Sequence, residues 1–206
     1  MRPGLRRNPI PRLQCTTSLP GLYQERTMTH IQAEMVYPAV ATACALAGSV
    51  FDVKSRRIPN LVTFPCFLLG LVLHLVLGGW KQMLLSLAAG AICGLVFLLF
   101  YLAGGMGAGD VKLIMAVGCI AGLSHIVYIL SLTAIAGGVM ALGLALMRGR
   151  LQETFLNVGE LITHHRHKGL QPHPDLNLTN ARTLRLPYAL AIAGGCLLTL
   201  YIQVAA

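Results

Sequence analysis

Six apolar runs follow one another along the chain after residue 34. They cover residues 35–51, 61–77, 83–102, 111–123, 126–147 and 187–204. Runs of this kind predict membrane-crossing helices, because about 20 apolar residues span the hydrocarbon core of a bilayer. The fourth run is short for a full crossing, and its Gly118 and Gly122 favour close packing against neighbouring helices. The pattern therefore predicts an all-α membrane protein, a bundle of about six transmembrane helices.

The composition supports this interpretation. Of the 206 residues, 55% are hydrophobic and 11% are charged, whereas about a quarter of the residues of a soluble domain are charged. The length allows one membrane domain, which we expect over residues 35–206. The net charge of +9 does not indicate nucleic-acid binding, because the basic residues stand at the ends of apolar runs. They are typical of topology signals that also meet anionic lipid headgroups.

Two segments are polar. Residues 1–34 hold four prolines and five arginines without an apolar run, and we expect a disordered tail. The other segment is a polar loop at 148–186, between the last two apolar runs. Within it, the histidines of 163–175 raise the question of a metal site, but their spacing matches no helix-borne ligand motif. The six cysteines form no CxxC pair, so we expect no metal. His74 and His125 are expected at an interface or satisfied in the core.

The basic residues also predict an orientation. Lys54, Arg56, Arg57 and Lys112 fall on one side of the bundle, together with the basic residues of the 148–186 loop, whereas the opposite side receives Lys81 and the arginines of the tail. The positive-inside rule places the first group in the cytoplasm. Because the arginines of the tail disagree, our hypothesis is that translation starts at Met28 or Met35. Peptides from residues 1–27 in the native protein would contradict it.

Only two of the seven acidic residues touch the membrane segments, namely Asp52 and Asp110. An ionisable group near the hydrocarbon is costly, so a function is expected. With six alternating helices, the end of the first and the start of the fourth lie on the same face. Two carboxyls in a poorly hydrated cleft share a proton, since both cannot ionise easily. Such a pair can activate a water for attack on a peptide carbonyl.

The residues around the two acids fit this chemistry. Gly107 and Gly109 allow close approach of a substrate backbone, and Lys112 is expected to extend toward the headgroups rather than pair tightly with Asp110. Asp110 is also a reasonable helix N-cap. Capping does not explain Asp52, because an anion at a helix C-terminus is disfavoured by the helix dipole.

These motifs resemble those of a known family. GAGDVK, residues 107–112, is similar to the GxGDxK pattern of the type IV prepilin peptidases, and DVKSRRIPN, residues 52–60, resembles their other signature. RLPYALAIAGG, residues 185–195, is similar to their last helix. The resemblance covers residues 36–201 apart from the 148–184 loop. It implies that Asp52 and Asp110 are the catalytic pair and that Gly107 and Gly109 shape the loop.

The resemblance further implies removal of the short basic leader of prepilins or pseudopilins at the cytoplasmic face of the inner membrane, without a metal or organic cofactor. The absence of CxxC pairs favours the short branch that serves Flp or Tad-type pili and does not methylate the new amino terminus. Two alternatives remain open. One is a small ion or proton transporter, whose acids would act on flux, and the other is a non-enzymatic membrane scaffold of a pilus or secretion assembly.

Overall fold

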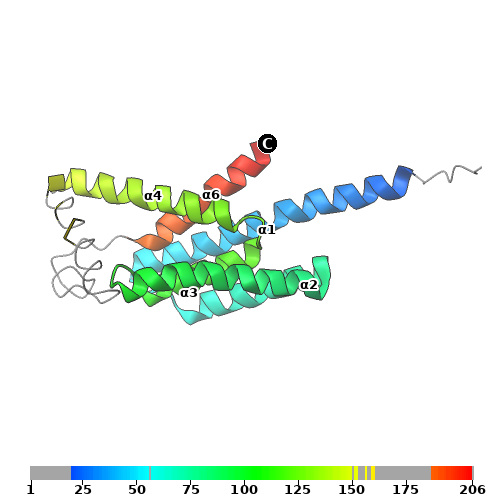
Figure 1. Ribbon diagram of the computed structural model, residues 1–206, viewed down its shortest axis with the longest axis horizontal. Coiled ribbons are helices and arrows are strands. Elements are labelled where there is room, and N and C mark those ends of the chain that lie inside the picture. The colour runs from blue at the N-terminus through cyan, green and yellow to red at the C-terminus, as the bar shows by residue number, and fades with distance from the viewer. Residues whose placement is uncertain are drawn as a thin grey trace, which may run out of the picture.

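The computed structural model describes residues 20–55, 57–149, 151–152, 156, 159–160 and 187–205, with the backbone alone for 20–34. The regular elements in this part of the chain are all helices. They are α1 (Pro20–Ser55), α2 (Asn60–Leu102), α3 (Ala108–Ala121), α4 (Ile126–Met147) and α6 (Tyr188–Ala205). Figure 1 shows them as an elongated bundle from which the start of α1 projects.

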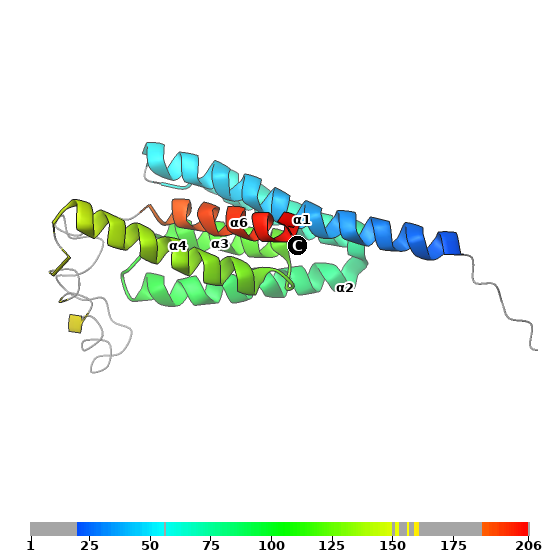
Figure 2. The same ribbon diagram turned by 90° about the horizontal axis from the view of Figure 1, so that it is seen from above.

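The helix count differs from the expected six. The two apolar runs at 61–77 and 83–102 both belong to α2, which is interrupted at Gly79 with φ 76° and ψ −177°. A positive φ is accessible to glycine at little cost, so the chain can reverse there. Figures 1 and 2 show α2 doubling back at one end of the bundle. The turn therefore acts as a helix boundary inside α2.

In the part of the chain that the structure describes, four segments are long and apolar enough to cross a membrane: Met35–Ser55, Asn60–Leu102, Ile126–Met147 and Tyr188–Ala205. The fourth apolar run forms α3, which has only 14 residues. A helix of that length rises about 21 Å, less than the roughly 30 Å hydrocarbon core. The apolar residues of α3 thus serve packing inside the protein rather than a complete crossing.

The α3 helix lies at the centre of the core. Leu113, Ile114, Val117 and Ile120 are fully buried. Both halves of α2 pack against it closely: a Cβ on Gly70 would lie 2.8 Å from the Ile120 nitrogen, and one on Gly90 would lie 2.9 Å from the Met115 oxygen. Gly118 likewise meets Cys93, as its place in a short apolar run suggested. Small residues on α2 and α3 therefore set how closely these helices approach.

Residues 20–34 differ from the expected disordered tail, because α1 already begins at Pro20. Proline is tolerated in the first turn of a helix, where its missing N–H would have no intrahelical partner. The segment after Gly21 contains no further glycine or proline before Pro38, so the helix of the apolar run can propagate backward through it. Residues 1–19 lie outside the described residues, as does most of the 148–186 loop.

The direction of the helices places the two acidic positions together. In Figures 1 and 2 the end of α1 and the start of α3 lie at the same end of the bundle. The turn at Gly79 and the connection from α3 to α4 lie at the opposite end. These two ends are called the aspartate end and the histidine end below, because the second holds His74 and His125.

Candidate functional site

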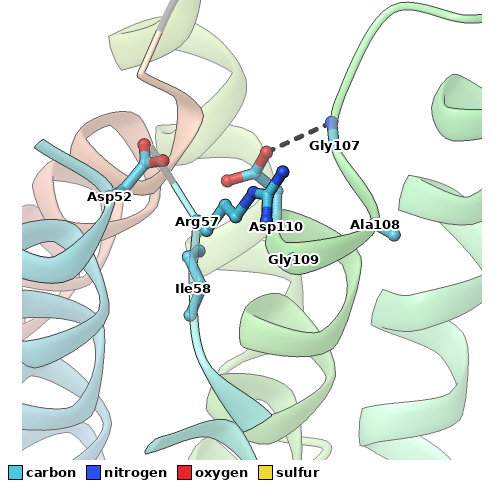
Figure 3. Close-up of a pocket in the computed structure, with 7 residues that line it drawn as sticks. All are labelled: Asp52, Arg57, Ile58, Gly107, Ala108, Gly109 and Asp110. Carbon is cyan, nitrogen blue, oxygen red and sulfur yellow. Dashed lines mark hydrogen bonds between the residues drawn. The ribbon is translucent and has the colours of Figure 1, made fainter. Parts of the chain in front are cut away.

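A pocket of about 330 Å³ opens at the aspartate end. It is lined by Asp52, Arg57, Ile58, Gly107, Ala108, Gly109 and Asp110. Asp52 comes from the last turn of α1 and Asp110 from the first turn of α3. Figure 3 shows the two carboxyl groups at this pocket, with the 57–58 segment between them in that view. The structure thus brings Asp52, Asp110, Gly107 and Gly109 to one site.

Gly109 lets the connection between α1 and α2 lie against the start of α3. A Cβ at Gly109 would stand 3.3 Å from the Cβ of Ile58, closer than side chains normally pack. Pro59 precedes α2 in an extended conformation, with φ −70° and ψ 144°, and proline fixes φ near this value. The absent side chain at 109 and the rigid proline at 59 together hold the α1–α2 connection beside Asp110.

Asp110 stands at the third position of α3, and Gly107 is the N-cap. The Gly107 N–H donates to Asp110 Oδ2 at 3.3 Å. This contact resembles one half of a capping box, in which the third side chain reaches back to the N-cap N–H. The Asp110 Oδ1 atom is buried and has no hydrogen-bond partner among the described residues. A capping role therefore accounts for one carboxyl oxygen and leaves the other unexplained.

The surroundings of Asp110 favour its protonated form. Burial, followed by the charge of Asp52, raises the pKa of Asp110 to about 6, although the Gly107 N–H opposes this shift. Burial acts because the charged form loses hydration, and Asp52 acts because two nearby anions repel. Asp52 itself is half-buried and stands at a helix C-terminus, where an anion is disfavoured. Two acids with these properties in one pocket are typical of a functional site.

Lys112 does not line the pocket. Its Nζ donates to Asn60 Oδ1 at 3.0 Å, and both side chains are exposed. This hydrogen bond joins α3 to the start of α2, so Lys112 supports the packing around the site from outside.

Three lining residues, Arg57, Ile58 and Ala108, are not among the site residues that the sequence predicts. Arg57 and Ile58 belong to the same short motif as Asp52, and Ala108 stands between the two predicted glycines. These positions in the two motifs are the signal that points to them. The approach of Ile58 to Gly109 brings the two motifs together, and the linear sequence does not display that contact.

No group of three or more His, Cys, Asp or Glu side chains with metal-binding potential occurs in the described part of the chain. The histidines of 163–175 lie outside those residues. His74 and His125 are both buried and lie at the histidine end, away from the two aspartates.

Comparison with known proteins gives one match. Residues 39–142 match the family model described as the type IV leader peptidase family. The match covers both aspartates and the whole lining of the pocket. Neither the curated proteins nor the solved structures gave a match to the chain.

Proposed function

We propose that this chain, which belongs to the type IV leader peptidase family, is a membrane-embedded aspartic endopeptidase whose reaction is carried out by Asp52 and Asp110. The observation that carries this proposal is the pocket that both carboxyls line. Support comes from the raised pKa of Asp110, since a pair that shares one proton supplies an acid and a base at once.

The environments suggest which acid plays which part. Asp110 is the more buried of the two and holds the proton, so it donates to the substrate carbonyl oxygen. Asp52 is the general base of the proposed reaction, and it takes a proton from water as the water oxygen bonds to the carbonyl carbon. In the second step Asp52 returns its proton to the amide nitrogen while the C–N bond breaks. One hydroxyl of the tetrahedral intermediate gives its proton back to Asp110, and the pair regains its first state.

The glycines of the pocket fit an extended peptide as substrate. Gly107, Gly109 and the small Ala108 line one wall, so a peptide backbone can approach Asp110 without meeting a bulky side chain. Lys112 takes part only by fixing the start of α3 through Asn60.

The substrate we propose is a prepilin or pseudopilin of the Flp or Tad type, cut after its short basic leader. Family membership supports a leader peptide as substrate. Among the described residues, the basic side chains Lys54, Arg57, Lys112 and Arg148 belong to the aspartate end, whereas Lys81 follows the turn at the other end. By the positive-inside rule this distribution supports a cytoplasmic site in a bacterial inner membrane.

The test is coexpression with a candidate prepilin that carries a basic leader, a glycine and then a long apolar helix. Wild-type enzyme should shorten the prepilin on a gel, and mass spectrometry should place the new amino terminus directly after the glycine. The double variant Asp52→Asn/Asp110→Asn should leave the prepilin intact although it inserts into the membrane at the wild-type level. Cleavage by the double variant would refute the aspartic mechanism, and pilus assembly in its presence would favour a scaffold.

A further inference from the structure

A second pocket, of about 360 Å³, lies at the histidine end, where the turn within α2 meets the connection from α3 to α4. Its polar lining comes from Tyr37, His74, Gln82, Ser86, Ser124 and His125. His74 is 5% exposed and His125 is 6% exposed. Two nearly buried imidazoles in one pocket are not required by the proposed peptidase chemistry.

Both histidines donate to backbone oxygens at the C-terminus of α3. His74 Nε2 lies 3.1 Å from the Ile120 oxygen, and His125 Nδ1 lies 2.9 Å from the Ala121 oxygen. The last carbonyls of a helix lack intrahelical donors, so these contacts satisfy groups that would otherwise be unpaired. Because a carbonyl oxygen only accepts, each of the two ring nitrogens carries the proton.

The remaining ring nitrogens are therefore lone-pair acceptors in the neutral imidazoles. These are Nδ1 of His74 and Nε2 of His125, and neither has a hydrogen-bond partner within the described residues. Both rings line the same pocket. A histidine that gives one N–H to a carbonyl and offers its other nitrogen has the arrangement found in metal-ligating histidines.

Contacts on two sides hold the His74 ring in one position. It stacks on Tyr37 with centroids 4.2 Å apart and an interplanar angle of 7°. On another side Gly122 has a φ of 74°, and a Cβ there would come within 2.8 Å of the His74 Cε1 atom. This ring is thus held in place before any ligand arrives, which lowers the entropic cost of binding.

We propose that the pocket at the histidine end binds a divalent transition-metal ion, such as Zn²⁺ or Cu²⁺, through Nδ1 of His74 and Nε2 of His125. The chemistry of the lining selects this class of ion: it offers imidazole nitrogens and no carboxylate, whereas Ca²⁺ and Mg²⁺ require several oxygen ligands, usually with carboxylates. Water, or the side-chain oxygen of Gln82, completes the coordination. A bound ion would join α2 to the start of α4 and stabilise the bundle.

The chain permits a clean test, because it has only seven histidines. A variant with His30, His164, His165, His167 and His173 replaced by glutamine keeps only His74 and His125, and it is purified without a histidine tag. Electron paramagnetic resonance with one equivalent of Cu²⁺ should show coupling to two equatorial nitrogens. Zn²⁺ should raise the thermal unfolding temperature of the same variant, since an ion that binds only the folded state stabilises it.

Two further variants keep the result interpretable. In this background, His74→Gln and His125→Gln should each weaken Cu²⁺ binding by more than about tenfold and reduce the coupled nitrogens to one. If either of these variants fails to fold, the number of nitrogens coupled to Cu²⁺ in the variant that keeps both His74 and His125 still tests the proposal. The proposal would be overturned if the Cu²⁺ spectrum of the variant that keeps both histidines showed coupling to one nitrogen or none. It would also be overturned if Zn²⁺ still raised the unfolding temperature after His74→Gln and after His125→Gln. Cleavage of prepilin is not part of this readout, so the two proposals succeed or fail separately.

Discussion

The two ends of α3 differ in whether their buried polar groups have hydrogen-bond partners. At its C-terminus, Ser86 Oγ donates to the Cys119 oxygen at 2.6 Å. The two histidines donate hydrogen bonds to the next two carbonyl oxygens, those of Ile120 and Ala121. At its N-terminus, one oxygen of Asp110 has a single hydrogen bond at 3.3 Å and the other has none among the described residues. One end of the same helix is satisfied, and the other carries a costly carboxyl.

This difference indicates where the chain gives up stability for function. Buried polar groups are usually paired, and an exception calls for a reason. The partner of Asp110 in the proposed reaction is a water or a substrate carbonyl, neither of which belongs to the protein. The contrast predicts that polar substitutions have effects of opposite sign at the two ends.

The largest expected effect concerns the two acids individually. Asp52→Asn and Asp110→Asn should each lower kcat/KM for prepilin cleavage by more than about 10³-fold, because the first change removes the base that takes a proton from water and the second removes the acid that donates to the carbonyl. The matched control is Asp175→Asn, which alters the only other aspartate of the chain and should cleave at the wild-type rate. A single variant with more than a few per cent of wild-type activity would contradict the pairing.

Asp110→Asn should also stabilise the folded protein at pH 8. The pKa of Asp110 is raised from its model-peptide range to about 6, so its contribution to stability is present below about pH 4 and is lost as the pH rises through 6. The gain at pH 8 should be on the order of 2 to 3 kcal/mol and should shrink toward pH 4. Thermal unfolding in detergent at several pH values measures it. A gain that does not change with pH would oppose this explanation.

Gly109→Ala tests the approach of the α1–α2 connection to α3. The new methyl group would meet Ile58 and push the segment that follows Asp52 away from Asp110. A displacement of this kind should reduce kcat/KM by about tenfold to a hundredfold. Adding Ile58→Ala should restore part of the activity. Gly138→Ala is the control, because the added Cβ would have no described neighbour within 4 Å apart from the adjoining backbone of its own helix. Equal losses of kcat/KM in Gly109→Ala and Gly138→Ala would show that the close approach of Ile58 to Gly109 does not matter for the reaction.

The smallest expected effect lies at the satisfied end. Ser86→Ala removes the donor to the Cys119 oxygen and should destabilise the protein by about 1 to 2 kcal/mol, with prepilin cleavage unchanged at a temperature where the variant is folded. Thermal unfolding beside the exposed Ser131→Ala control measures this. A stabilised Ser86→Ala variant would remove the contrast between the two ends.

The sequence predicted the helical class, because hydropathy locates the helices. It also predicted that the two acids lie at the same end of the bundle, because successive helices run in alternating directions. The residues at 61–77 and 83–102 are helical as expected, but one turn at Gly79 places them in a single element. The backward extension of α1 to Pro20 was missed, since proline and arginine content says little about whether an adjoining helix propagates.

Finer features of the sites depend on contacts between distant segments. Which atom of Asp110 lacks a partner follows from the packing of α3, and the meeting of Ile58 with Gly109 depends on how the α1–α2 connection lies. The histidines were expected at an interface or satisfied in the core, but nothing in their local sequence reveals that both face the last carbonyls of α3. Motif spacing cannot supply such information, because each contact joins different helices.

The most direct measurement of the central claim is the titration of Asp110 with and without Asp52. The infrared carbonyl band of a protonated carboxyl, followed against pH and assigned by its loss in Asp110→Asn, reports the pKa of Asp110. In wild type it should lie near 6. In Asp52→Asn it should fall but stay above the ordinary range, because the burial contribution remains. An identical pKa in the two proteins would show that the carboxyls do not act on each other.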